Sequence, residues 1–82
     1  MYNLIFDKSA LKYFDKLDKF EQEKIGRKFE QLKQNPKLGK SLTANLTGFW
    51  SLRVGKYRII YQIKYEELII FILDIGHRKN IY

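Results

Sequence analysis

The sequence predicts a single α+β domain spanning residues 1–82. An N-terminal strand and a two-helix hairpin pack on one face of a mainly antiparallel four-stranded sheet. Three observations predict this layout. Apolar residues recur at helical spacing up to Pro36, residues 50–61 (WSLRVGKYRIIY) alternate in character around a glycine turn, and a further apolar run follows at 67–75. With 82 residues and 45% hydrophobic content, the chain can build one core.

The first half predicts one strand and two helices. Residues 2–6 form the strand, and a helix over 8–17 follows with Asp7 as its N-cap. Asp18 and Glu21 resemble the capping box of a second helix that ends at Pro36. Its apolar stripe is Phe20, Ile25, Phe29 and Leu32. The short connection between the helices predicts an antiparallel hairpin.

The second half predicts a loop over residues 35–48 and strands at 49–54, 57–64 and 67–75. Gly55-Lys56 has the composition of a two-residue hairpin turn, which sets Arg53 directly opposite Arg58. A second turn at Tyr65-Glu66 sets Arg58 opposite Leu73 and Ile59 opposite Ile72.

One face of this sheet lacks an obvious cover. The face with Arg53 and Arg58 also carries apolar residues, namely Ile60, Ile69, Phe71 and Leu73. Because the helical hairpin covers only the other face, either the 35–48 loop folds over Ile69 and Phe71 or a protein partner covers them.

The composition limits the class of protein. No cysteine is present, so disulfides and thiolate metal sites are excluded. Charges from Asp7 onward leave no room for a signal peptide, and the apolar run at 68–73 is too short to span a bilayer. The default is a cytoplasmic protein with no membrane contact. The net charge of +7 indicates a polyanionic partner, although solubility alone also explains a basic surface.

Arginines concentrate where the predicted strands meet. Like charges directly opposite each other destabilise a ladder, so stability alone does not explain Arg53 against Arg58. Arg78 follows the last strand and need only fold back a few residues to approach Arg58. Guanidinium groups match phosphate oxygens, so these three arginines predict a phosphate site. The alternative for each arginine is a solvated surface residue.

Two segments, LTGFWSLRVGKYRIIYQI and IIFILDIGHRKNIY, resemble the RelE family of type II toxin–antitoxin toxins, within the RelE/ParE superfamily. The resemblance covers essentially the whole chain. It implies a small-ribonuclease-like fold and a ribosome-dependent endoribonuclease that cleaves mRNA in the ribosomal A site. It also implies a cognate antitoxin that wraps the toxin in a hetero-oligomer.

The resemblance assigns roles residue by residue. Arg58 matches the phosphate-binding arginine, Arg53 a basic position, and Arg78 the arginine after the last strand. Tyr82 matches a tyrosine that stacks on the substrate base and supports catalysis. Ser51 departs from the family, since many relatives carry a lysine or arginine there. The chain also stops at Tyr82, without the extra C-terminal helix of some relatives.

The chemistry these residues support is attack by the RNA 2′-hydroxyl on the adjacent phosphorus, which leaves a 2′,3′-cyclic phosphate. We expect no cofactor and no metal, because one histidine and few carboxylates cannot build a catalytic cage. His77 is a possible general acid or base. However, neighbours on a strand point to opposite sides, so His77 and Arg78 do not easily face one phosphate. The alternative for His77 is a backbone-bonded histidine at a strand end.

Lysines extend the possible RNA or ribosome contact. Lys56 and Lys79 lie beside the arginines, and Lys12 and Lys16 lie on the helical hairpin, where ribosomal RNA could bind. A plain solvated helix face is the alternative. Two other functions remain open: a ParE-like toxin that poisons gyrase, and a catalytically weak homologue that acts through antitoxin binding.

Overall fold

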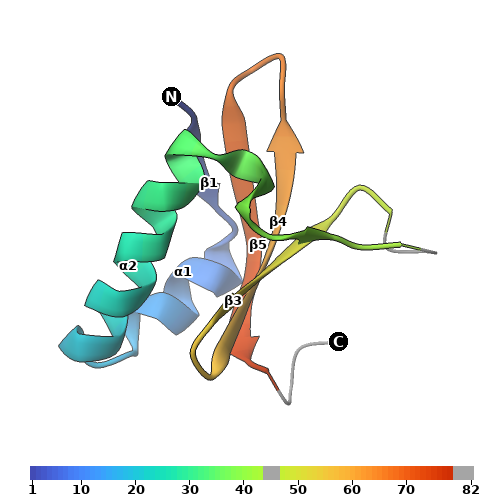
Figure 1. Cartoon of the computed structure of the whole chain (residues 1–82). Helices are drawn as coiled ribbons and strands as arrows, with labels where there is room; N and C mark the ends of the chain where they lie inside the picture. The colour runs from blue at the N-terminus through green and yellow to red at the C-terminus, as the bar shows by residue number, and fades with distance from the viewer. Residues whose placement is uncertain (44–46, 79–82) are drawn as a thin grey trace.

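A computed structural model describes residues 1–43 and 47–78. The chain begins with β1 (Asn3–Phe6), followed by α1 (Lys8–Asp15) and α2 (Lys19–Gln34). A short 3-10 helix, η1 (Pro36–Leu38), leads into β2 (Lys40–Ser41). The remaining strands are β3 (Trp50–Val54), β4 (Tyr57–Lys64) and β5 (Ile69–His77). Figure 1 shows both α-helices on one side of the sheet.

The α+β class is confirmed, with one strand more than the four predicted. The described sheet has the order β1-β5-β4-β3-β2, in which β1 runs parallel to β5 and the other pairs are antiparallel. The additional strand, β2, is only two residues long and lies inside the predicted 35–48 loop. It pairs with Ser51 and Trp50 of β3. Two residues carry no readable alternation, so the sequence could not reveal it.

Both predicted helix caps are present. The Asp7 carboxylate accepts a hydrogen bond from the Ser9 backbone N–H at 3.1 Å, and Asp18 accepts one from the Glu21 N–H at 2.9 Å. Phe20 was placed in the buried stripe of α2, but it is 67% exposed. It lies in the first turn of α2, ahead of the part that packs against the sheet, so its prediction as a core residue is wrong.

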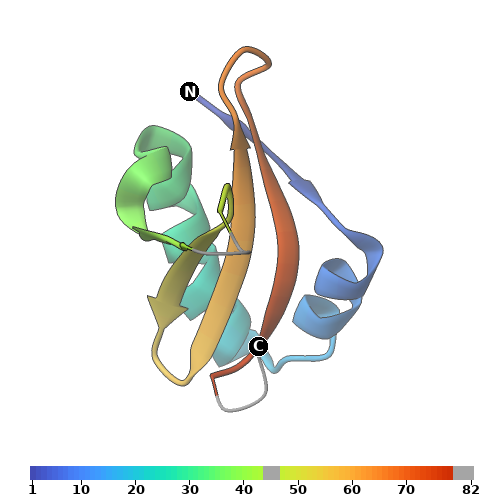
Figure 2. The ribbon, with the colours of Figure 1, turned by 90° about the vertical axis from the view of Figure 1, so that its right-hand side faces the viewer.

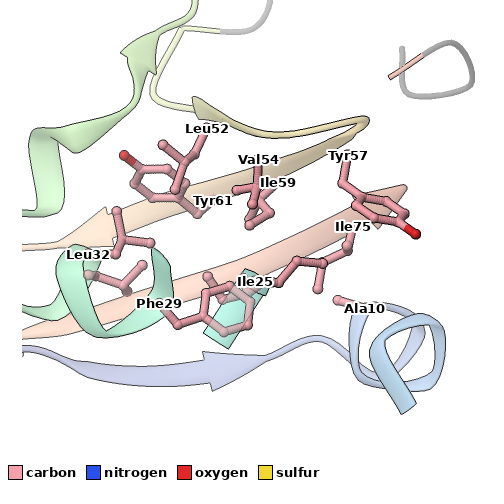
Figure 3. Packing of buried hydrophobic residues seen from close by; sticks show 12 residues of the cluster. Ala10, Ile25, Phe29, Leu32, Leu52, Val54, Tyr57, Ile59, Tyr61 and Ile75 are labelled. Atoms are coloured by element: carbon pink, nitrogen blue, oxygen red, sulfur yellow. The ribbon is translucent and has the colours of Figure 1, made fainter. Parts of the chain in front are cut away.

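The core lies between the helices and one face of the sheet. Ile25, Phe29 and Leu32 of α2 pack against inward side chains of β3, β4 and β5 (Figure 3). Those inward side chains are Leu52, Val54, Tyr57, Ile59, Tyr61, Ile70, Ile72 and Ile75. Trp50 stacks on Tyr61 with ring centroids 6.2 Å apart, and both rings pack in the core.

The predicted register between β4 and β5 is wrong. Tyr61 pairs with Ile72, and Arg58 pairs with Gly76 instead of Leu73. Two features cause the change. Residues 65–68 form a four-residue connection in which Leu68 adopts a φ of 55°, and a bulge between the Ile60 and Tyr61 pairings leaves Leu73 without a cross-strand partner. Near the turn the shift preserves the faces, so Ile70 and Ile72 still point into the core.

The second face of the sheet, called the open face below, is turned toward the viewer in Figure 2. Its apolar side chains remain partly accessible: Ile5 is 45% exposed, and Ile60, Ile69 and Phe71 are only partly buried. Within the described part of the 35–48 segment, Leu38 packs against the core and Leu42 lies near β3. Leu46 lies outside the described residues. No described helix is long and apolar enough to cross a membrane.

Candidate functional site

The β3–β4 hairpin has the predicted register. Arg53 lies directly opposite Arg58, because Gly55 adopts a φ of +58° in the two-residue turn. Arg53 is exposed, whereas Arg58 is partly buried and its Nε atom is buried. Two guanidinium groups therefore share one spot on the open face, at an electrostatic cost that a bound anion would reverse.

A cavity of about 420 Å³ opens beside this arginine pair. Three cationic side chains line it, from Lys40, Arg53 and Arg58, and the described lining contains no acidic residue. The remaining lining residues are small, hydroxylic or apolar: Leu38, Gly39, Ser41, Leu42, Ser51 and Leu52. Cations, hydroxyl groups and an apolar wall together suit a ligand that joins an anionic group to a flat or apolar one, as a nucleotide does.

Tyr61 holds the wall of this cavity in place. Its hydroxyl donates a hydrogen bond to the Pro36 carbonyl at 2.7 Å and accepts one from the Gly39 N–H at 3.1 Å. Gly39 approaches β3 so closely that a Cβ there would lie 2.5 Å from the Ser51 carbonyl oxygen. Burial raises the pKa of Tyr61, so its hydroxyl keeps the proton that it donates.

The end of β5 lies at the end of the sheet where the β3–β4 turn lies (Figure 2), and Arg78 follows β5 directly. Its backbone N–H donates to the Lys56 carbonyl at 2.9 Å, and Gly76, the partner of Arg58, precedes it by two residues. The backbone therefore brings Arg78 to the neighbourhood of Arg58, although Arg78, unlike Arg53 and Arg58, is not among the described residues that line the cavity. The Lys56 ammonium lies over the Tyr57 ring, 5.7 Å from its centroid, and does not line the cavity.

His77 lies on the other side of the sheet from the arginine pair. It is the cross-strand partner of Tyr57, which is buried in the core, and partners across a ladder share a face. His77 and the arginine pair therefore lie on opposite faces of the sheet. The pKa of Tyr57 itself is raised, mainly by burial and to a smaller extent by the negative charge of Glu21.

The other predicted contact residues divide into two groups. Lys12 of α1 and Lys16 at its C-cap are exposed, on the helical side of the molecule and away from the cavity. Lys79 and Tyr82 lie outside the described residues.

Within residues 1–43 and 47–78, no group of three or more His, Asp or Glu side chains gathers in a way that could hold a metal ion.

Two residues that line the cavity, and one neighbour on the open face, were not assigned from the sequence. Lys40 lines the cavity because the short strand β2 pairs with β3, which no sequence pattern indicated. Ser51 was noted only as a departure from the family, yet its hydroxyl accepts a hydrogen bond from Arg58. Asp74 is exposed and pairs with Ile60 on the open face, because the bulge at Leu73 changes which side chains point outward.

A helical hairpin on one face of a small mixed sheet is a fold that this chain shares with a solved toxin of a toxin–antitoxin complex, which indicates a type II toxin. The chain belongs to this class: residues 4–82 match the family described as ParE toxin of type II toxin-antitoxin system, parDE.

The named relatives include RelE toxins. The mRNA interferase toxin RelE of Escherichia coli K12 is 28% identical over 81 residues, which cover 96% of this chain and 85% of the relative. Toxin RelG of Mycobacterium tuberculosis is 40% identical over 55 residues, or 66% of this chain and 63% of RelG. The toxin–antitoxin complex RelBE2 of M. tuberculosis contains a chain with a TM-score of 0.84 and 32% identity, covering 94% of this chain and 98% of that one.

Proposed function

We propose that this chain is a ribosome-dependent mRNA endoribonuclease toxin, active in the cytoplasm and neutralised by a cognate antitoxin. The observation that carries the proposal is the pairing of Arg53 with Arg58 beside a cavity lined by cations and hydroxyl groups. A relative named as an mRNA interferase supports the same reaction class. The ribosomal A site is the place of cleavage in this proposal, and exposed lysines such as Lys12 and Lys16 contact ribosomal RNA.

In the proposed reaction the RNA supplies its own nucleophile. The 2′-oxygen forms a bond to the adjacent phosphorus and loses its proton, while the bond from phosphorus to the 5′-oxygen breaks and that oxygen takes up a proton. The products are a 2′,3′-cyclic phosphate and a free 5′-hydroxyl. Arg58 and Arg53 stabilise the charge on the nonbridging oxygens, and Arg78 acts on the phosphate or the leaving oxygen. Tyr82 stacks on a base and takes part in proton transfer.

The test measures cleavage of an mRNA on actively translating ribosomes. Removing one well-placed donor to a transition-state oxyanion lowers kcat about 10²- to 10³-fold, and we expect this loss for Arg58→Ala. Arg27→Ala is the matched control, because Arg27 is an exposed arginine on α2 in the other layer of the molecule. Equal cleavage by the wild type and Arg58→Ala would refute the assigned role.

The antitoxin is proposed to cover the open face. Ile5, Ile60 and Phe71 leave apolar surface beside the arginine pair, so an amphipathic and acidic partner segment suits this face. The related M. tuberculosis toxin was solved as a complex with its antitoxin. We expect the isolated chain to bind a hydrophobic dye that its antitoxin displaces. A chain that binds no dye would count against this surface.

A second candidate function is gyrase inhibition, which the match to the ParE toxin family favours. Such a toxin acts by binding protein and DNA, and it needs no cleavage of RNA. A cell extract with active ribosomes and gyrase separates the candidates. Codon-positioned mRNA cuts support the nuclease, gyrase-trapped DNA breaks support the ParE-like activity, and neither outcome indicates a toxin that acts only through antitoxin binding.

A further inference from the structure

Among the described residues, Ser51 is the buried polar side chain. It is 8% exposed, and it lies in the middle of β3 on the same face as Arg53. A buried hydroxyl requires a hydrogen-bond partner, and that of Ser51 accepts one from Nη1 of Arg58 at 3.4 Å. Ser51 pairs with Ile60, so Arg58 is its diagonal neighbour across the ladder. Long side chains reach that diagonal position.

The location of Ser51 makes this contact directional. Repulsion from Arg53, directly opposite, disfavours any position of the Arg58 guanidinium close to it. The Ser51 hydroxyl attracts that guanidinium along the sheet and toward the cavity that both side chains line. This acceptor therefore restricts the orientations that a long side chain can adopt.

The backbone that carries Ser51 is itself closely held. Its carbonyl lies against Gly39, where an added Cβ would come within 2.5 Å of the carbonyl oxygen. Gly39 is fixed in turn by the hydrogen bond from its N–H to the Tyr61 hydroxyl. A hydroxyl on a rigid strand, locked by a second layer of contacts, is suited to preorganise a catalytic group.

We propose that Ser51 is a positioning residue, which orients the Arg58 guanidinium for the transition-state phosphate. This inference rests on the proposed nuclease function and deepens it. Ser51 supplies a hydrogen-bond acceptor for Arg58 and adds no charge of its own. The charge of the site then comes from Arg53, Arg58 and Lys40.

The kinetic test compares Ser51→Ala and Ser51→Thr in translation-dependent mRNA cleavage. Loss of one hydrogen bond to Arg58 lowers kcat about three- to tenfold with little change in KM, because the lost interaction matters in the transition state. Threonine keeps the hydroxyl and suits a strand, so we expect its kcat within about twofold of the wild type. In an Arg58→Ala background, Ser51→Ala should cause no further loss. An equal loss in both backgrounds would overturn the proposal.

A second measurement tests the positioning without any cleavage. The Nε–Hε signals of the arginine side chains are recorded by NMR for the wild type and for Ser51→Ala. We expect the Arg58 signal to shift or broaden, while the signal of the control residue Arg27 stays unchanged. An unchanged Arg58 signal would overturn the positioning role even if the wild type cleaves no RNA. Absence of cleavage by the wild type, with a changed Arg58 signal, would instead refute the nuclease function alone.

Discussion

Replacing Tyr61 by phenylalanine removes one oxygen atom that joins the cavity wall to the sheet. The ring remains and keeps its stacking on Trp50, so the buried apolar area is nearly unchanged. Two hydrogen bonds are lost, one to the Pro36 carbonyl at 2.7 Å and one from the Gly39 N–H at 3.1 Å. At about 0.5–1.5 kcal/mol each, the free energy of unfolding should fall by about 1–3 kcal/mol.

Urea denaturation followed by circular dichroism measures this difference directly. In a domain of 82 residues, such a loss lowers Tm by about 4–24 °C. Tyr65→Phe is the matched control, because Tyr65 is 52% exposed and its contact with the Lys37 ammonium needs only the ring face. We expect that control to change stability by less than about 0.5 kcal/mol. If Tyr61→Phe unfolds at the same urea concentration as the control, the wall is not held by this hydroxyl.

Three further predictions concern backbone, charge and pH. Gly39→Ala should destabilise the fold, because the added Cβ would lie 2.5 Å from a backbone oxygen. Gly26→Ala on α2 should instead raise stability by about 0.5–1 kcal/mol, because no atom lies within 4 Å of the added Cβ. Thermal unfolding of both variants measures the contrast. Sulfate should raise the Tm of the wild type more than that of Arg53→Gln, because the anion relieves repulsion from Arg58; equal shifts would argue against a shared anion site. Folding raises the pKa of Tyr57, so its contribution to the free energy of unfolding should be fully present below pH ~10 and fall as the pH rises above that value. Tyr57→Phe should show a smaller fall. Identical alkaline profiles of the two proteins would contradict this.

The β3–β4 hairpin was predictable because a two-residue turn leaves one register. Gly55 takes the positive φ that the turn needs, and the opposition of Arg53 and Arg58 follows at once. The β4–β5 pairing was not predictable in the same way. Its connection is longer, Leu68 adopts a positive φ without being glycine, and a bulge at Leu73 then shifts the register again.

The candidate site also contains one part that the sequence could predict and one part that it could not. The arginine pair was readable because strand pairing places it, and the position of His77 away from that pair agrees with simple alternation along β5. The cavity wall could not be predicted from the sequence, because it depends on contacts between segments far apart in the chain. Gly39 meets Ser51 and Tyr61 only once the sheet exists, and Lys40 reaches the cavity through the same contact.

The position of β5 in the sheet also bears on biosynthesis. β5 lies between β1 and β4, although it is the last of these strands in the chain. The N-terminal strand β1 has no neighbour in the sheet until β5 has emerged from the ribosome, and the helices have an incomplete surface to pack on until then. A nascent chain therefore cannot close its sheet, or assemble a finished toxin, until nearly all of the sequence described here has been translated.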